Sequence, residues 1–96
     1  MFVKFKTALS MEEAMARSEK RMPEFRAMPG LVQKYYCREP ATGEMAGVYL
    51  WDSHESLKAF LASDIRESIP TVYEIEGAPR IEVLEVVHEL RDSPKR

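Results

Sequence analysis

Hydrophobic and polar residues alternate along the first eight positions of the chain, and the pattern then becomes helical. The alternation over residues 1–8 predicts a β-strand. Ser10 is followed three residues later by Glu13, a capping box that marks the start of a helix. The inward positions of this helix, at helical spacing, are Met11, Met15, Ser18, Met22 and Phe25. Pro23 is expected to end or kink the helix near Met22.

The middle of the chain predicts a β-hairpin followed by a second helix. Leu31–Arg38 and Met45–Trp51 are rich in β-branched and aromatic residues, and the loop between them contains Pro and Gly. Asp52 or Ser53 is expected to cap a second amphipathic helix, which runs to about Ser63.

The last third of the chain is expected to contain short helical turns and a final strand. Pro70 argues against one continuous helix within Asp64–Gly77. The residues expected to face inward from these turns are Ile65, Ile69, Val72 and Ile75. Arg80–Arg91 predicts the last strand, with residues 92–96 as a frayed tail.

The order strand–helix–strand–strand–helix–strand predicts the fold class. Two split βαβ units of this order form a ferredoxin-like α+β sandwich, in which two helices cover one face of a four-stranded antiparallel sheet. We therefore expect residues 1–96 to form a single domain of this type.

Both faces of the predicted sheet are apolar. In the third strand, Ala46, Val48 and Leu50 face one way, and Gly47, Tyr49 and Trp51 face the other. The last strand repeats the pattern more weakly, with Ile81, Val83 and Val87 opposite Leu84, Val86 and Leu90. Two helices cannot cover both faces, so we expect a homodimer that packs sheet against sheet.

Composition and charge exclude several classes of protein. The 96 residues are 45% hydrophobic and 31% charged, which is typical of a globular protein rather than a disordered one. The formal charge of −2 disfavours nucleic-acid binding through a basic patch. No apolar run approaches the ~18 residues of a membrane span, and no secretory signal is visible. The single Cys37, expected to be a small buried hydrophobe, fits a reducing cytoplasm.

The motifs of common catalytic and metal sites are absent. The four glycines form neither a GxGxxG sequence nor a Walker loop. His54-Glu55 begins like HExxH, but Lys58 stands where the second His would be. Asp52, His54 and Glu55 are better explained as caps and first-turn charges than as metal ligands. The sequence therefore predicts no metal site.

Aromatic residues gather around the hairpin. Tyr35, Tyr36, Tyr49 and Trp51 lie on its strands, His54 follows, and Tyr73 can join from the irregular segment. Such residues are often only core. Buried Tyr hydroxyls and a Trp N–H need partners, however, and an apolar wall with a few donors is typical of a small-molecule site. A flat aromatic ligand would suit such a pocket.

Two further candidates lie near the end of the chain. His88 and Arg80 fall on the same side of the predicted last strand. His88 could act as an acid–base group or simply be solvated. Arg80 could anchor an acidic group of a substrate, or pair with Glu82 or with a partner chain.

Three segments carry a resemblance to a known family. They are PGLVQKYY, AGVYLWDSHESLKAFLAS and PRIEVLEVV, and the resemblance covers the chain from Pro29 to Leu90. These segments resemble the YdhR-type monooxygenases, within the antibiotic-biosynthesis-monooxygenase-like group of dimeric α+β barrels. The resemblance implies a dimeric barrel in which O₂ oxidises a substrate held between sheet and helices, without metal, flavin or haem.

Two site residues of the family have a match in this chain, and a third does not. Trp51 matches the tryptophan that closes the third strand in quinone-forming members, and Tyr49 matches the tyrosine of the YdhR-type motif. Those enzymes also use an asparagine near the site. This chain contains no Asn, and Gly47 stands four residues before Trp51. Either Gln33 or a tyrosine takes that role, or the chain does not run the reaction.

The sequence thus leads to three hypotheses on one fold. The first is a cofactor-independent monooxygenase of a small aromatic molecule, with Trp51, Tyr49 and His54 as catalytic residues. Its substrate-binding residues would be Tyr35, Tyr36, Tyr73, Arg80 and His88. The second is a non-catalytic dimer of the same fold that binds or senses a small molecule. A structural dimer with a filled core is a third possibility.

Overall fold

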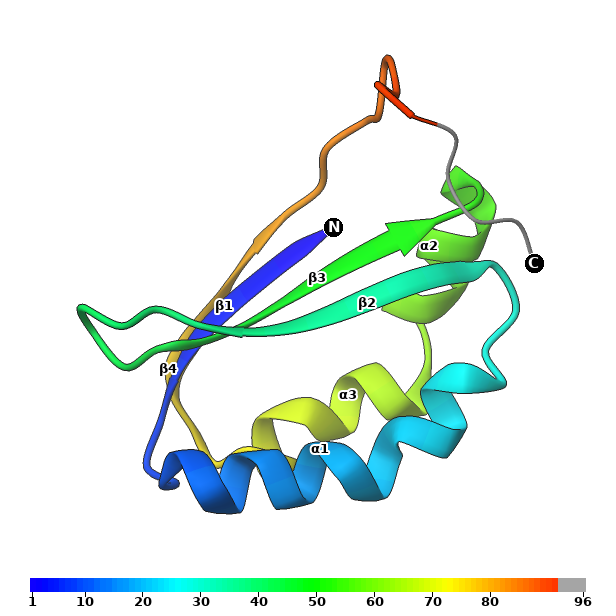
Figure 1. Ribbon diagram of the computed structural model, residues 1–96. Helices are drawn as coiled ribbons and strands as arrows, with labels where there is room; N and C mark the ends of the chain where they lie inside the picture. Colours follow the sequence, from blue (N-terminus) through cyan, green and yellow to red (C-terminus); the bar gives the residue numbers. More distant parts are fainter. Residues whose placement is uncertain (92–96) are drawn as a thin grey trace.

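A computed structural model of the chain, which describes residues 1–91, shows a four-stranded antiparallel sheet with helices on one side (Figure 1). The predicted tail, residues 92–96, lies outside the described residues. Within residues 1–91 the elements are β1 (Phe2–Thr7), α1 (Met11–Arg26), β2 (Leu31–Arg38), β3 (Met45–Trp51), α2 (His54–Leu61), α3 (Asp64–Val72) and β4 (Ile75–Glu82). The ferredoxin-like α+β fold is confirmed, with one helix more than expected.

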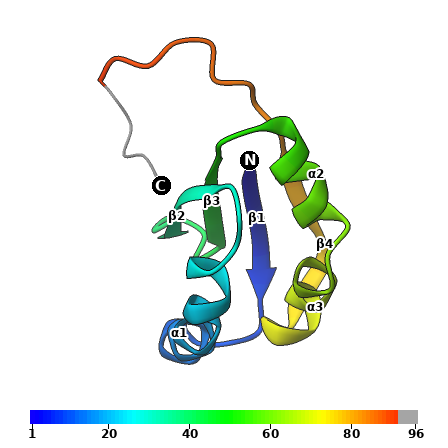
Figure 2. The ribbon, with the colours of Figure 1, turned by 90° about the vertical axis from the view of Figure 1, so that its right-hand side faces the viewer.

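The strands lie in the order β2-β3-β1-β4, so the first and last strands are neighbours. Figure 2 shows this order, with α1 towards the β2 side of the sheet and α3 towards the β4 side. The predicted hairpin is confirmed with the same bounds. Arg38 pairs with Met45 next to the loop, and the pairing continues to Lys34 opposite Tyr49 and Leu31 opposite Trp51.

The predicted helix starts are confirmed by their caps. The Ser10 hydroxyl accepts a hydrogen bond from the Glu13 N–H at 3.2 Å. At α2 the cap is Ser53 rather than Asp52, since the Ser53 hydroxyl accepts from the Ser56 N–H at 3.1 Å. Each cap satisfies a backbone N–H that has no partner within the helix.

Neither proline ends its helix, which contradicts an end of α1 near Met22 and separate helical turns around Pro70. Helix α1 continues through Pro23 to Arg26, and α3 is one continuous helix that contains Pro70. Both prolines lie within the last turn of their helix, where the missing N–H removes a single backbone hydrogen bond. The residues Ile65, Ile69, Val72 and Ile75 pack against the core as predicted.

The prediction of a last strand over Arg80–Arg91 was wrong. Strand β4 spans Ile75–Glu82, and its last pair with β1 is Glu82 opposite Phe2. Glu82 is the last residue of β4 that pairs with β1, and residues 83–91 pair with no strand of the described chain. Residues 83–91 therefore leave the sheet as an extended segment (Figure 1).

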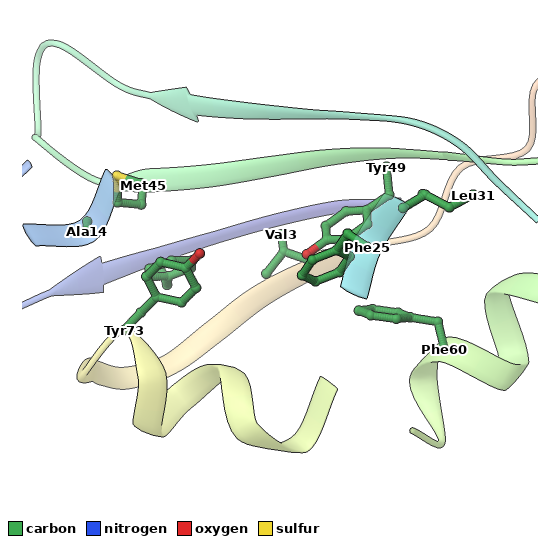
Figure 3. Close-up of a cluster of buried hydrophobic side chains, with 9 residues drawn as sticks. Val3, Ala14, Phe25, Leu31, Met45, Tyr49, Phe60 and Tyr73 are labelled. Atoms are coloured by element: carbon green, nitrogen blue, oxygen red, sulfur yellow. The ribbon is translucent and has the colours of Figure 1, made fainter. Parts of the chain in front are cut away.

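The core lies between the sheet and the helices. Figure 3 shows side chains from the sheet, from α1 and α2, and from Tyr73 directly after α3 in this space. The buried cluster consists of Val3, Phe5, Ala14, Phe25, Leu31, Met45, Tyr49, Phe60 and Tyr73. No helix within residues 1–91 combines the length and apolar character that crossing a membrane requires.

The other face of the sheet is open. Phe2, Val48 and Tyr35 form a row across β1, β3 and β2, and Val48 and Tyr35 are 36% and 58% exposed. We call this surface the open face. Cys37 lies on it, in the row that contains Ala46, and is exposed. The expectation that Cys37 is buried was therefore wrong for the single chain, because the strand turns it away from the helices.

Candidate functional site

Four aromatic rings meet under the helices and form the candidate site. Tyr49 and Trp51 point there from β3, Phe25 from the end of α1 and Phe60 from α2. The Tyr49 and Phe60 ring centroids are 5.3 Å apart, and those of Trp51 and Phe60 are 5.2 Å apart. The Tyr49 and Trp51 rings are nearly parallel, with centroids at 6.2 Å. We call these four residues the aromatic cluster.

The aromatic cluster contains one buried polar group without a partner. Trp51 Nε1 is buried and finds no hydrogen-bond acceptor among the described residues. Leaving such a donor unsatisfied costs about 1–3 kcal/mol. An oxygen atom of a bound ligand could accept this hydrogen bond.

A lysine lies against the same rings. Lys34 on β2 sits opposite Tyr49, and its Nζ is 3.5 Å from the Phe25 ring centroid and 4.5 Å from that of Tyr49. The ring of Tyr36 lies at 4.4 Å. Burial, with a smaller contribution from the Arg21 charge, lowers the pKa of Lys34 to about 7.

Sequence reasoning did not single out Lys34. A lysine in an alternating strand resembles a solvent-facing residue. The hairpin register could have found it, because pairing Arg38 with Met45 places Lys34 across from the buried Tyr49.

The tyrosines predicted for the site fall into different environments. Tyr49 is buried in the aromatic cluster, and burial raises the pKa of its hydroxyl. Tyr36 is half-buried beside Lys34, and burial likewise raises its pKa. Tyr73 is buried at the end of α3, where its hydroxyl lies 2.6 Å from the Ser18 hydroxyl. Tyr35 lies on the open face, away from the helices.

The other predicted residues are not brought to the aromatic cluster. His54 is the exposed first residue of α2, and His88 is exposed in the segment beyond β4. Arg80 is exposed on the open face with its Nε 3.7 Å from Glu82, as one of the alternatives expected. Gln33 is also exposed and pairs with Leu50, so the structure does not place its side chain with the four rings.

The position of Gly47 has a local structural role. A Cβ atom at this residue would lie 3.0 Å from Cε1 of Tyr49, so the tyrosine ring covers the glycine. A larger side chain there would displace the ring. The space that an asparagine would need is therefore filled by Tyr49.

The surface has two hollows near residues of interest. One, of about 330 Å³, lies between the Met28–Pro29 turn and α2, and Phe60 forms part of its wall. Phe60 is the member of the aromatic cluster that lines this hollow. The other, of about 240 Å³, lies at the β1–β4 bulge and is lined by Lys4, Lys6 and Arg80. Over residues 1–91, no group of three His, Cys, Asp or Glu side chains is placed to hold a metal ion.

Comparisons with known proteins agree on the fold. The family model described as "Putative mono-oxygenase ydhR" matches residues 1–86. SnoaB from Streptomyces nogalater, described as a cofactor-independent oxygenase, is similar in structure with a TM-score of 0.61 and 17% identity, over 91% of this chain and 95% of SnoaB. A search of curated proteins found no match.

Two further solved structures share the fold. NE2512 from Nitrosomonas europaea, a protein of unknown function, has a TM-score of 0.74 and 16% identity, over 97% of this chain and 92% of its own. A protein from Caulobacter crescentus, described as a putative antibiotic biosynthesis monooxygenase, has a TM-score of 0.65 and 21% identity, over 91% and 87% of the two chains. The arrangement of strands and helices described above is therefore one that other proteins share.

Proposed function

The chain belongs to the ydhR mono-oxygenase family, and from that premise we propose that it oxidises an aromatic small molecule with O₂ without a cofactor. The observation that carries the proposal is the buried Trp51 N–H, which lies among aromatic rings without an acceptor. The description of SnoaB as a cofactor-independent oxygenase on the same fold supports it.

The aromatic cluster suits a flat ligand that carries an oxygen atom. Phe25 and Phe60 offer apolar ring surface, and the Trp51 N–H can donate a hydrogen bond to the ligand oxygen. We propose that the ligand enters through the hollow beside Phe60. Tyr49 supports the Trp51 ring from the neighbouring position on the same face of β3.

The proposed reaction converts an aromatic alcohol into a quinone. The substrate loses its phenolic proton, and the resulting anion supplies electrons to O₂. One oxygen atom becomes a carbonyl of the product and the other leaves as water. The protein binds the ring, excludes water and stabilises the anion, and the donor at Trp51 is placed for that last task.

Oxygen consumption with 1,5-dihydroxynaphthalene tests this proposal. The expected product is 5-hydroxy-1,4-naphthoquinone with water, and ¹⁸O₂ should place one labelled atom in each. Trp51→Phe keeps an aromatic ring but removes the N–H, and we expect kcat to fall on the order of 10²-fold. Heat-denatured protein provides the non-enzymatic rate.

Two results would contradict the oxygenase function. The first is a rate no higher than that of the denatured protein for this substrate and for related aromatic alcohols. The second is label from ¹⁸O₂ that is absent from the quinone. Ligand binding without oxygen consumption would support a binding or sensing protein instead, an alternative favoured by the absence of Asn from the chain.

We also propose that the protein is a homodimer formed through the open face. A row of apolar side chains is exposed there, and the segment beyond β4 exposes Val83, Leu84 and Val87 as well. A second copy would cover both surfaces and would bury Cys37. A reducing cytoplasm would suit this unpaired thiol.

A further inference from the structure

Lys34 is an amine placed among aromatic rings. It lies on the edge strand β2, and its side chain reaches the space under the end of α1. Its Nζ lies within 4.5 Å of the ring centroids of Phe25, Tyr36 and Tyr49. Within the described part of the chain it makes no ion pair. We call Lys34 and these three rings the lysine cage.

The charged groups around the lysine cage do not compensate the ammonium. Arg21, from α1, adds a like charge. Glu24 follows on the same helix but is 61% exposed and lies 3.9 Å from Arg21. The charge of Arg26 lowers the pKa of Tyr36 and so opposes the larger effect of burial on that pKa. Burial first, and the like charge of Arg21 second, favour loss of a proton from Lys34, and its pKa of about 7 leaves much of the amine neutral near neutral pH.

The other titratable groups of the lysine cage cannot serve as bases near neutral pH. Burial raises the pKa of both Tyr36 and Tyr49, so their hydroxyls keep their protons. His54 is exposed at the start of α2 and is not one of the residues of the lysine cage. The Lys34 amine is thus the basic group beside the aromatic cluster. The lysine cage and the aromatic cluster share two residues, Phe25 and Tyr49.

We infer that Lys34 is the catalytic residue that accepts the phenolic proton of the substrate, an inference that rests on the proposed function. The O–H bond of the substrate breaks, and its proton forms a new N–H bond with the Nζ lone pair. The electron pair stays on the substrate oxygen and spreads into the ring, from which O₂, the oxidant of the proposed reaction, withdraws electrons. The ammonium that forms then lies beside the anion.

This geometry defines the substrate class as weakly acidic aromatic alcohols. The rings of Phe25 and Tyr49 match a flat ligand, and the amine needs a substrate that still carries its proton near neutral pH. Phenols meet this condition, since the tyrosine hydroxyl has a pKa of about 10. Aromatic acids, already ionised, would bind beside the ammonium without proton transfer.

The protonation of Lys34 can be measured without any turnover. The Cε signals of ¹³C-lysine-labelled protein are followed against pH, and the signal absent from Lys34→Arg is assigned to Lys34. We expect a midpoint of about 7. A midpoint near the ordinary lysine value of about 10 would overturn the inference, whatever the activity.

Turnover tests the catalytic role. The rate should rise with pH through about 7 and then level, because the base is the neutral amine. Lys34→Met and Lys34→Arg should each lower kcat on the order of 10²-fold and abolish this inflection, and Lys58→Arg, at an exposed lysine of α2, should change neither. Ethylamine should partly restore activity to Lys34→Ala, which a merely structural role would not allow.

The outcomes separate this inference from the function on which it rests. Full kcat and an unchanged pH profile in Lys34→Met would overturn the role of Lys34 and leave the oxygenase in place. Absence of oxygen consumption by the wild-type protein would overturn the oxygenase, and the role of Lys34 with it. If Lys34→Met does not fold, two other experiments test the role of Lys34. They are the kcat and pH profile of Lys34→Arg and the rescue of Lys34→Ala by ethylamine.

Discussion

Two buried polar groups in the core of this protein differ in their hydrogen bonding. The Tyr73 hydroxyl lies 2.6 Å from Ser18 Oγ, and Ser18 in turn donates to the Ala14 carbonyl at 3.0 Å. Trp51 Nε1 has no such partner among residues 1–91. The first arrangement stabilises the fold by joining α1 to the end of α3, whereas the second leaves a buried donor unsatisfied, which is the donor that we propose a ligand oxygen uses.

We predict that Ser18 and Tyr73 act as a pair. Ser18→Ala leaves the buried Tyr73 hydroxyl without its partner and should lower the free energy of unfolding by about 1–3 kcal/mol. Tyr73→Phe should cost about 1 kcal/mol, and the double variant should cost less than the two together. Urea denaturation of the four proteins measures this, and strictly additive losses would contradict the pairing.

At the residue scale, the sequence predicted some environments and missed others. The helical spacing placed Ser18 on the inner face of α1, and it is fully buried. Tyr35 and Tyr36 are both predicted for the site, but strand alternation sends them to opposite faces of the sheet. Lys34 was missed because its environment comes from α1, β2 and β3 together, and no local pattern contains all three.

Among the elements, α2 depends on a close contact with the turn that precedes β2. Gly30 adopts a φ of +83°, and a Cβ atom there would lie 2.1 Å from Oγ of Ser56 on α2. The Gly30 carbonyl also accepts a hydrogen bond from the Asp52 N–H at 2.8 Å. The glycine thus lets the turn approach the first turn of the helix that carries Phe60.

Gly30→Ala is therefore expected to destabilise the protein more than Gly43→Ala. Both residues have positive φ, but nothing lies within 4 Å of a Cβ at Gly43. Gly43→Ala should cost about 1–2 kcal/mol, and Gly30→Ala about 1–3 kcal/mol more because of the steric overlap. Equal denaturation midpoints for Gly30→Ala and Gly43→Ala would contradict this prediction. They would show that the overlap with Ser56 is relieved without loss of stability.

The elements were predicted well where the signals were local. The hairpin and the Ser10 cap follow from neighbouring residues, and both are confirmed. Of the two caps expected for α2, the structure has Ser53. The continuation of α1 through Pro23 and of α3 through Pro70 was not predicted, because a proline locally favours the end of a helix. In the folded protein, packing against the sheet outweighs the one hydrogen bond that each proline removes. The end of β4 could not be predicted from its own pattern, since it is fixed by where β1 begins.

For the whole molecule, the open face and the segment beyond β4 are the exposed apolar surfaces through which we propose that two copies assemble. Val87 and Leu90 are each 88% exposed, and Leu84 is 75% exposed. Isolated apolar residues are common on protein surfaces, but a sheet face and an adjoining segment together mark an interaction site. The proposed dimer would cover them.

Val48→Glu should convert the proposed dimer into a monomer. The substitution places a charge in the middle of the apolar row between Phe2 and Tyr35, where burial without a partner is costly. Light scattering should give about half of the wild-type mass. Ala16→Glu, on the exposed side of α1, is the matched control and should remain dimeric. A wild-type monomer, or a dimeric Val48→Glu, would contradict this interface.

The pairing of β1 with β4 also affects how the chain is made. Phe2 and Glu82 are about 80 residues apart in sequence, yet they are neighbours in the sheet. At about 5–20 residues per second on the ribosome, the first strand waits roughly 4–16 s for its partner. The β2–β3 hairpin can form during that time, but one edge of β1 remains open. The nascent chain therefore carries a strand with one unpaired edge, which is suited to chaperone binding until the last strand is synthesised.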